Sequence, residues 1–186
     1  MRARHPTIWL ITDERLASEL WRALRRLPPS AGVVFRHHAT PEPERTRLFC
    51  KVRRVAAARR LIVISAHGRL PGAAGVHGPG RGGGLRTWPA HDRRQAITAK
   101  RAGAALVFVS PVYPTRSHPG ATALGPMRAA RLGQSLGLKL IALGGMDARR
   151  WLRIRQFGFD GWAGIDAWST CPDKPKHTAA KPRRRS

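Results

Sequence analysis

The chain has 186 residues, 42% of them hydrophobic, so its length and composition fit one domain with a buried core and exclude a globally disordered chain. Its 35 Lys and Arg residues against 10 Asp and Glu give a formal net charge of +25, which favours phosphorylated or polyanionic ligands. Two cysteines exclude a disulfide-rich scaffold, and no apolar run approaches the roughly 20 residues that span a bilayer, so we expect a cytoplasmic protein without a membrane segment.

Eight short apolar runs are predicted to be β-strands. In chain order they cover residues 8–12, 33–37, 61–65, 75–78, 85–88, 105–110, 140–145 and 161–166. Several are apolar on both faces, as in LIVIS and ALVFVS, which is typical of parallel strands covered by helices rather than of a half-exposed antiparallel sheet. The runs therefore predict a parallel sheet at the centre of the fold.

Amphipathic segments lie between most of these runs and are predicted to be helices. They cover residues 14–26, 43–59, 91–102, 125–136 and 147–157. Asp92 and Asp147 precede two of them and are predicted N-caps, and Asp13 is predicted to cap the helix after the first run. The stretches after the third and fourth runs contain Pro and Gly and are too short for a typical helix.

The alternation of eight strands with helices predicts an α/β protein, a small (β/α)₈ TIM barrel with shortened helices. A doubly wound open sheet is the competing arrangement. We assign the barrel to residues 1–169, because residues 170–186 show no periodicity and hold six basic residues against one acid. That composition predicts a disordered basic tail that is dispensable for folding and binds polyanions without specificity.

The active site of a (β/α)₈ barrel lies at the carboxyl ends of its strands, so the residues there are the candidates. The segment SPVYPTRSHPG after the sixth run carries Thr115, Ser117 and His118 on a Pro-rich loop that could surround a phosphate. Gly144 and Gly145 end the seventh run, where missing side chains let a phosphate approach backbone N–H groups.

Histidines form a second group of candidates at the predicted barrel mouth. They are His37, His38, His67, His77 and His118. Neutral imidazoles bind Zn²⁺, but no carboxylate or Cys stands beside these residues to complete a site. We therefore predict that they line the mouth and contact phosphate, and we predict no metal site from them.

Four segments, in their order and spacing, resemble the thiamine phosphate synthase and thiazole tautomerase family: WLITDE, FVSPVYPTRSHPG, LIALGGM and GWAGIDAW. GVHG and TWPAHDRRQAITAKRAGAALVFVSPV are similar to the same family, and the resemblance covers roughly residues 8–168. It implies a TIM barrel of thiamine biosynthesis. The implied reaction joins hydroxymethylpyrimidine diphosphate to thiazole phosphate and releases diphosphate, so small phosphorylated substrates are the implied partners.

The resemblance also implies which residues bind the diphosphate. A Gln-x-Arg-x-Lys pattern at the end of the second strand falls on residues 34, 36 and 38, where only Arg36 is retained and His38 replaces the lysine. Two threonines and a lysine after the sixth strand fall on Thr115, Ser117 and His118. These cationic and hydroxyl groups would stabilise the departing diphosphate electrostatically.

The thiazole phosphate would meet Gly144 and Gly145 and the end of the eighth strand at Ile165 and Asp166. Asp166 stands where the family pattern has a serine, and a carboxylate repels phosphate. The tautomerase branch fits less well, because its catalytic histidine falls on Pro111.

The family also implies a Mg²⁺ cofactor, but the ligands for it are not matched here. The family carries an Asn-Asp-Arg motif after the third strand and a further Asp after the fourth, whereas this chain has ISAHGR and GVHGPGRGG without a carboxylate. Mg²⁺ prefers oxygen ligands, especially charged ones. Arginines such as Arg36, Arg69 or Arg81 would then have to neutralise the diphosphate directly.

Two other functions remain open at this point. The missing carboxylates favour a catalytically degenerate family member that binds a phosphorylated ligand of the thiamine pathway. The Arg-rich surface favours a nucleic-acid-binding protein, but 29 of the 35 basic residues are Arg, a skew typical of a G+C-rich gene, and aromatic residues are not interleaved with them. The oligomeric state cannot be read from the sequence.

Overall fold

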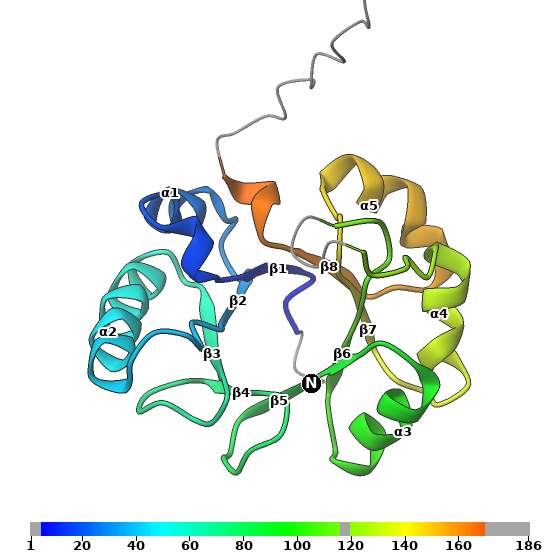
Figure 1. The fold of residues 1–186 in the computed structure, drawn as a ribbon, viewed down its shortest axis with the longest axis horizontal. Coiled ribbons are helices and arrows are strands. Elements are labelled where there is room, and N and C mark those ends of the chain that lie inside the picture. The colour runs from blue at the N-terminus through cyan, green and yellow to red at the C-terminus, as the bar shows by residue number, and fades with distance from the viewer. Residues whose placement is uncertain (1–4, 116–119, 170–186) are drawn as a thin grey trace, which may run out of the picture.

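Eight parallel strands close into a barrel in which each strand pairs with the next and the last pairs with the first (Figure 1). The computed structural model describes residues 5–115 and 120–169, so the predicted site residues Ser117 and His118 and the tail 170–186 lie outside the described residues. The strands are β1 (Ile8–Ile11), β2 (Gly32–Phe35), β3 (Ile62–Ala66), β4 (Gly75–His77), β5 (Leu85–Ala90), β6 (Leu106–Val109), β7 (Leu140–Ala142) and β8 (Gly161–Gly164). The predicted barrel is confirmed, and the doubly wound alternative is wrong.

Five α-helices pack around this barrel in the part of the chain that the structure describes. They are α1 (Glu19–Arg26), α2 (Glu42–Ala58), α3 (Arg93–Arg101), α4 (Pro126–Gln134) and α5 (Ala148–Ile154). Each overlaps a predicted helix, but the predicted helix 14–26 is divided in two. A 3₁₀ helix, Glu14–Leu16, precedes α1, because Ala17 has a φ of 41° that no right-handed helix contains.

The connections around β4 carry no helix among the described residues, as predicted, and they leave the lower left of the barrel in Figure 1 uncovered. β5 extends two residues beyond the predicted end at Trp88, through Pro89. Pro89 pairs with Phe108 of β6, whereas β4 has already ended at His77 opposite Thr87. The proline therefore breaks no hydrogen bond of the sheet, because the edge that would need its N–H has no partner strand.

A row of aromatic rings in edge-to-face contact connects the centre of the barrel with its mouth. Trp9 of β1 is fully buried, and its ring meets Phe108 edge to face at 5.3 Å between centroids. Gly32 pairs with Trp9 across β1 and β2, and a Cβ on it would fall within the Trp9 ring. Phe108 in turn contacts the ring of His77 edge to face at 5.0 Å. The floor of the mouth thus rests on a rigid aromatic core.

Aspartates begin the helices that follow β5 and β7, as predicted. The side chain of Asp92 accepts a hydrogen bond from the Gln95 N–H at 2.8 Å, and that of Asp147 accepts one from the Arg150 N–H at 2.8 Å. None of the helices in the described residues is long and apolar enough to cross a membrane.

Candidate functional site

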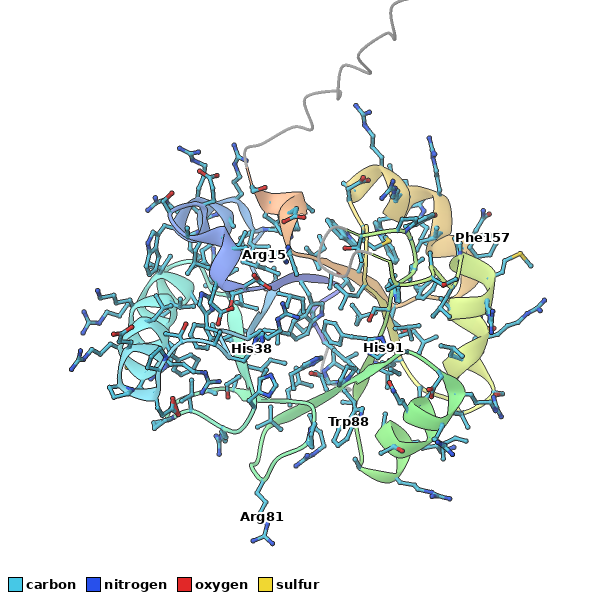
Figure 2. The ribbon with its side chains drawn as sticks, viewed as in Figure 1. Arg15, His38, Arg81, Trp88, His91 and Phe157 are labelled. Carbon is cyan, nitrogen blue, oxygen red and sulfur yellow. The ribbon has the colours of Figure 1, made fainter. Side chains whose placement is uncertain are left out.

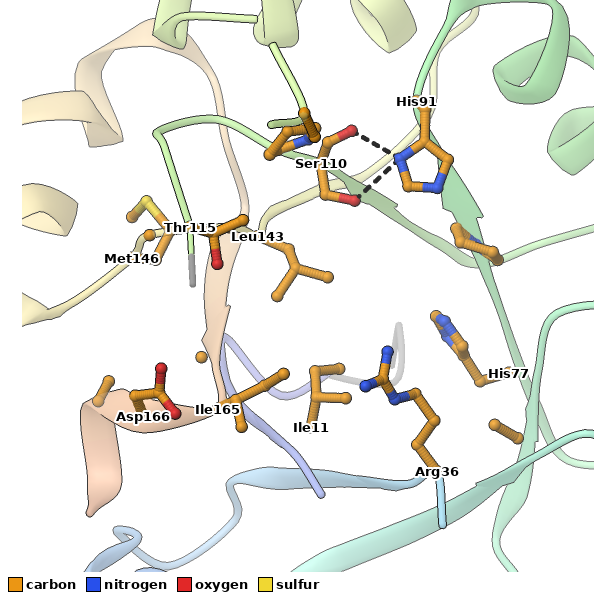
Figure 3. A pocket seen from close by; sticks show the side chains of 18 of the residues that line it. Ile11, Arg36, His77, His91, Ser110, Thr115, Leu143, Met146, Ile165 and Asp166 are labelled. Atoms are coloured by element: carbon orange, nitrogen blue, oxygen red, sulfur yellow. Dashed lines mark hydrogen bonds between the residues drawn. The ribbon is translucent and has the colours of Figure 1, made fainter. Parts of the chain in front are cut away.

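A cavity of about 900 Å³ opens at the carboxyl ends of the strands (Figure 3). Eight of the residues predicted for the site line it together: Arg36, His67, His77, Thr115, Gly144, Gly145, Ile165 and Asp166. His38 lies beside the cavity, with its ring 5.5 Å from that of His67. The remaining two, Ser117 and His118, are outside the described residues.

Arg36 projects from the end of β2 into the cavity, where it forms an ion pair with Asp13 (Figure 3). Asp13 is 5% exposed, caps the 3₁₀ helix as predicted, and also binds the Arg15 side chain at 2.7 Å. Burial would raise the pKa of Asp13, but the hydrogen bonds from Arg15 and Arg36 outweigh it and lower the pKa well below its usual range. Arg36 is thus partly neutralised, which reduces its capacity to bind a ligand anion.

The Nε of Arg36 is buried and has no hydrogen-bond partner within residues 5–115 and 120–169. A buried cationic donor without a partner costs free energy, and an acceptor atom of a bound ligand would satisfy it. The Arg36 side chain therefore still points to an anion in this part of the cavity, despite its pair with Asp13.

His77 of β4 forms part of the cavity floor and is held by Thr87 of β5. Its Nδ1 lies 2.8 Å from the Thr87 hydroxyl oxygen. Burial, together with the positive charges of Arg36 and His67, lowers the pKa of His77 to about 3. His77 is therefore a neutral hydrogen-bonding group at physiological pH and supplies no charge to the site.

His37 was predicted at the mouth, but its side chain is turned into the protein. It is 4% exposed, stacks on Phe35 with 4.8 Å between ring centroids, and lies 2.9 Å from the Thr12 hydroxyl through Nδ1. Burial lowers its pKa, although Glu14 and Asp13 oppose that effect. The side chain of the residue that follows β2 by two positions is thus a core contact and does not line the cavity.

The Gly144 and Gly145 backbone follows β7 and leaves its N–H groups available to a ligand. The carbonyls of Leu143 and Gly144 accept hydrogen bonds from Val112 at 2.8 Å and Tyr113 at 3.1 Å, and the carbonyl of Gly145 accepts one from the Arg150 side chain. In the described chain no acceptor is found for the N–H of either glycine. Successive N–H groups with free hydrogens form an anion-binding nest.

Glycine is required at both positions of this nest. The φ angles are 90° at Gly144 and 60° at Gly145. A Cβ on Gly144 would lie 2.7 Å from the Pro111 Cα, and a Cβ on Gly145 would lie 2.5 Å from the Pro114 carbonyl oxygen. The backbone after β7 is therefore packed directly against the backbone after β6.

Among the cavity residues that the sequence reasoning missed, His91 and Arg150 have side chains that could contact a ligand. His91 follows β5, and its Nδ1 lies 2.8 Å from the Ser110 carbonyl oxygen and 3.2 Å from the Ser110 hydroxyl (Figure 3). Because a carbonyl only accepts, Nδ1 carries a proton, and the Ser110 hydroxyl cannot donate to it. His91 was missed because β5 was predicted to end at Trp88.

Arg150 of α5 is the second of these missed residues. It lines the cavity, donates to the Gly145 carbonyl, and lies over the ring of Tyr113 at 4.8 Å from the centroid. These contacts place a positive charge beside the glycine nest. Its place could have been found from the sequence, because it occupies the first turn of the helix after the two glycines.

The cavity residues do not fit the Mg²⁺ site that the family pattern implies. Carboxylate oxygens are missing after β3 and β4, where the described chain has His67 and Gly78 instead. Over the described residues, no three or more His, Cys, Asp and Glu side chains are grouped so that they could hold a metal ion.

The geometry defines a (β/α)₈ barrel with a cavity at its mouth that is lined by Arg36, Arg150 and the glycine nest. Comparison with known proteins adds a family to this description of the fold. Residues 87–168 match the family model described as thiamine monophosphate synthase. The thiamine-phosphate synthase of Geobacillus thermodenitrificans (strain NG80-2) is 37% identical over 93 residues, which are 49% of this chain and 42% of that protein. The matched part thus spans less than half the length of that relative.

Solved structures support the same fold. The thiamine phosphate pyrophosphorylase from Pyrococcus furiosus superposes with a TM-score of 0.72 at 19% identity, covering 87% of this chain and 86% of that one. The corresponding protein from Bacteroides thetaiotaomicron gives 0.58 at 20% identity, covering 90% and 89%. The match over residues 87–168 thus supports the resemblance to the thiamine phosphate synthase family that the motifs in this part of the chain indicate.

Proposed function

We propose that this protein binds a pyrimidine diphosphate and a thiazole phosphate in the cavity and joins them to thiamine phosphate. The observation that carries the proposal is the glycine nest, in which three successive carbonyls are turned to protein partners and two N–H groups are left for an anion. A phosphate ester bound there would be stabilised by Arg150 beside it.

In the proposed reaction the bond between the pyrimidine methylene carbon and the diphosphate oxygen breaks, and the leaving diphosphate takes the electron pair. The thiazole nitrogen then supplies its lone pair to the methylene carbon and forms the new C–N bond. Arg36 and Thr115 would bind the departing diphosphate, while Ile11, Leu143 and Ile165 present apolar surface that shields the cationic carbon from water.

A second function, binding without catalysis, is favoured by two observations. Arg36 is already paired with Asp13, and the carboxylates that the family uses for Mg²⁺ are missing after β3 and β4. Both changes weaken stabilisation of a departing diphosphate. In this case the cavity would hold a phosphorylated ligand of the thiamine pathway without turning it over.

Complementation separates the two functions. We expect that expression of the chain restores slow growth without thiamine to a strain that lacks its own synthase, and that purified protein shows weak activity that a chelator changes little. No growth combined with calorimetric binding of thiamine phosphate would favour the non-catalytic function. Strong activity that a chelator abolishes would overturn the metal-independent mechanism.

A further inference from the structure

Two histidines from neighbouring strand ends stand together where the family pattern calls for a lysine and a metal-binding carboxylate. His38 follows β2 and His67 follows β3, and their rings are 5.5 Å apart and inclined by 39°. Both side chains are exposed, and His67 lines the cavity. The backbone of His67 has a φ of 54°, which is uncommon for a residue other than glycine and is found disproportionately at functional sites.

The charges around this pair are mostly positive. Four titratable or charged groups interact electrostatically with His38 or His67. They are Glu14 of the 3₁₀ helix, Arg36 at the end of β2, Arg45 of α2 and His77 of β4. Glu14 is the single carboxylate of this group, and it is held by the N–H of Ala39 at 2.8 Å. His77 stays neutral, so an anion at this wall would meet Arg36 and the two imidazoles.

We propose that His38 and His67 form an anion site that binds a diphosphate group through their ring N–H groups, without a metal ion, so that binding is coupled to protonation of His67. This inference rests on the proposed function for the class of ligand, a diphosphate. Arg36 would be the third residue of the site. Its side chain points into the cavity, and its buried Nε has no hydrogen-bond partner in the described part of the chain (Figure 3).

The coupling has a definite sign. Burial and then the positive charges of His38, Arg45 and Arg36 lower the pKa of His67, so this ring is largely neutral at pH 8 in the free protein. A bound polyanion offsets the repulsion from these charges and raises the pKa of His67. Because the bound state then holds the His67 proton more tightly than the free protein does, the affinity for the polyanion increases as the pH falls from 8 towards 5.5.

The test measures the affinity of inorganic pyrophosphate by calorimetry at pH 5.5 and pH 8, in EDTA, for the whole chain and a His38→Gln/His67→Asn double variant. Asn tolerates the positive φ at position 67, and thermal unfolding checks that the variant folds. Because the charge of pyrophosphate itself changes with pH, the ratio of the two proteins at each pH is the relevant quantity. His5→Gln is the matched control, since His5 faces Lys139 and Asp160 away from the cavity.

We expect the wild-type protein to bind about tenfold more tightly than the double variant at pH 5.5 and about equally at pH 8, since one unit of pKa shift corresponds to a tenfold change. An NMR titration of the His67 ring should show its pKa rising when pyrophosphate is added. A ratio that does not change with pH, or binding that requires added Mg²⁺, would overturn the inference. Failed complementation with an intact pH-dependent ratio would instead contradict only the proposed synthase activity.

Discussion

The two halves of the barrel have kept different parts of the family pattern. The half from β5 to β8 contains the match at 87–168, has α3, α4 and α5 after its strands, and retains the glycine nest. The half from β1 to β4 has lost the carboxylates expected after β3 and β4 and presents Arg36, His38 and His67 at the mouth. One half contains the proposed phosphate site and the other the proposed polyanion site.

The difference follows from the chemical origin of each site. The phosphate site is made of backbone N–H groups, which substitutions elsewhere leave in place as long as both glycines remain. The metal site of the family pattern is made of carboxylate side chains, and each can be lost in a single substitution. A backbone site is therefore the more durable of the two, and the following changes test the comparison.

The largest effect is expected from Gly144→Ala in the glycine nest. The new Cβ would lie 2.7 Å from the Pro111 Cα at a φ of 90°, so we expect unfolding free energy to fall by about 2–4 kcal/mol and phosphate binding to be lost. Gly137→Ala, with its φ of 66° and open space, should cost only about 1 kcal/mol. Urea unfolding measures both, and equal losses would show that the contact with Pro111 is unimportant.

The half from β1 to β4 can be tested at Asp13, because the lowered pKa of this carboxyl makes the free energy of unfolding depend on pH. Its folded pKa lies below the unfolded value, so the carboxylate stabilises the native state at neutral pH and this contribution disappears as the pH falls below about 4. Urea unfolding should show Asp13→Asn to be about 2 kcal/mol less stable than wild type at pH 7, with a smaller difference at pH 3. A difference that stays constant with pH would mean that the charge of Asp13 is not what stabilises the fold.

The polyanion site is tested by the double variant Arg36→Ala/Thr115→Ala. We expect calorimetry to show at least a tenfold weaker affinity for pyrophosphate or thiamine phosphate, about 1.4 kcal/mol, because a charged and a hydroxyl donor are removed. Arg81→Ala is the control for charge alone, since Arg81 does not line the cavity and points away from the barrel, contrary to the expectation that it neutralises the diphosphate (Figure 2). If the two variants bind equally, Arg36 and Thr115 do not contact the anion.

The smallest effect is expected from Asp166→Asn at the end of β8. Asp166 lines the cavity near the glycine nest and repels a bound phosphate, so its neutralisation should tighten binding of inorganic phosphate about three- to fivefold at low salt. Glu44→Gln on the exposed side of α2 removes the same charge far from the cavity and should leave binding unchanged. Weaker binding by Asp166→Asn would show that this carboxylate supports the site.

Much of the architecture could be predicted because its signals are local. A strand buried on both faces must be apolar throughout, so LIVIS and ALVFVS identify β3 and β6 without any knowledge of their neighbours. The helix starts at Asp92 and Asp147 depend on a cap three residues from the N–H that it binds. The predicted end of β5 at Trp88 was wrong because proline is normally excluded from the interior of a sheet. Pro89 is tolerated in β5 only because β4 ends at His77 and leaves no strand that would need the missing N–H.

By itself the sequence predicted the barrel, the resemblance of residues 87–168 to the thiamine phosphate synthase family, and the candidate phosphate site at Gly144 and Gly145, because apolar periodicity and glycine content are properties of contiguous residues. The tertiary structure alone decided that Arg36 is bound by Asp13, 23 residues away, and that His37 turns inward while His38 meets His67. These partners come from the ends of different strands, which closure of the barrel brings together. Charge neutralisation and pKa depend on such neighbours across the mouth, so no linear pattern contains them.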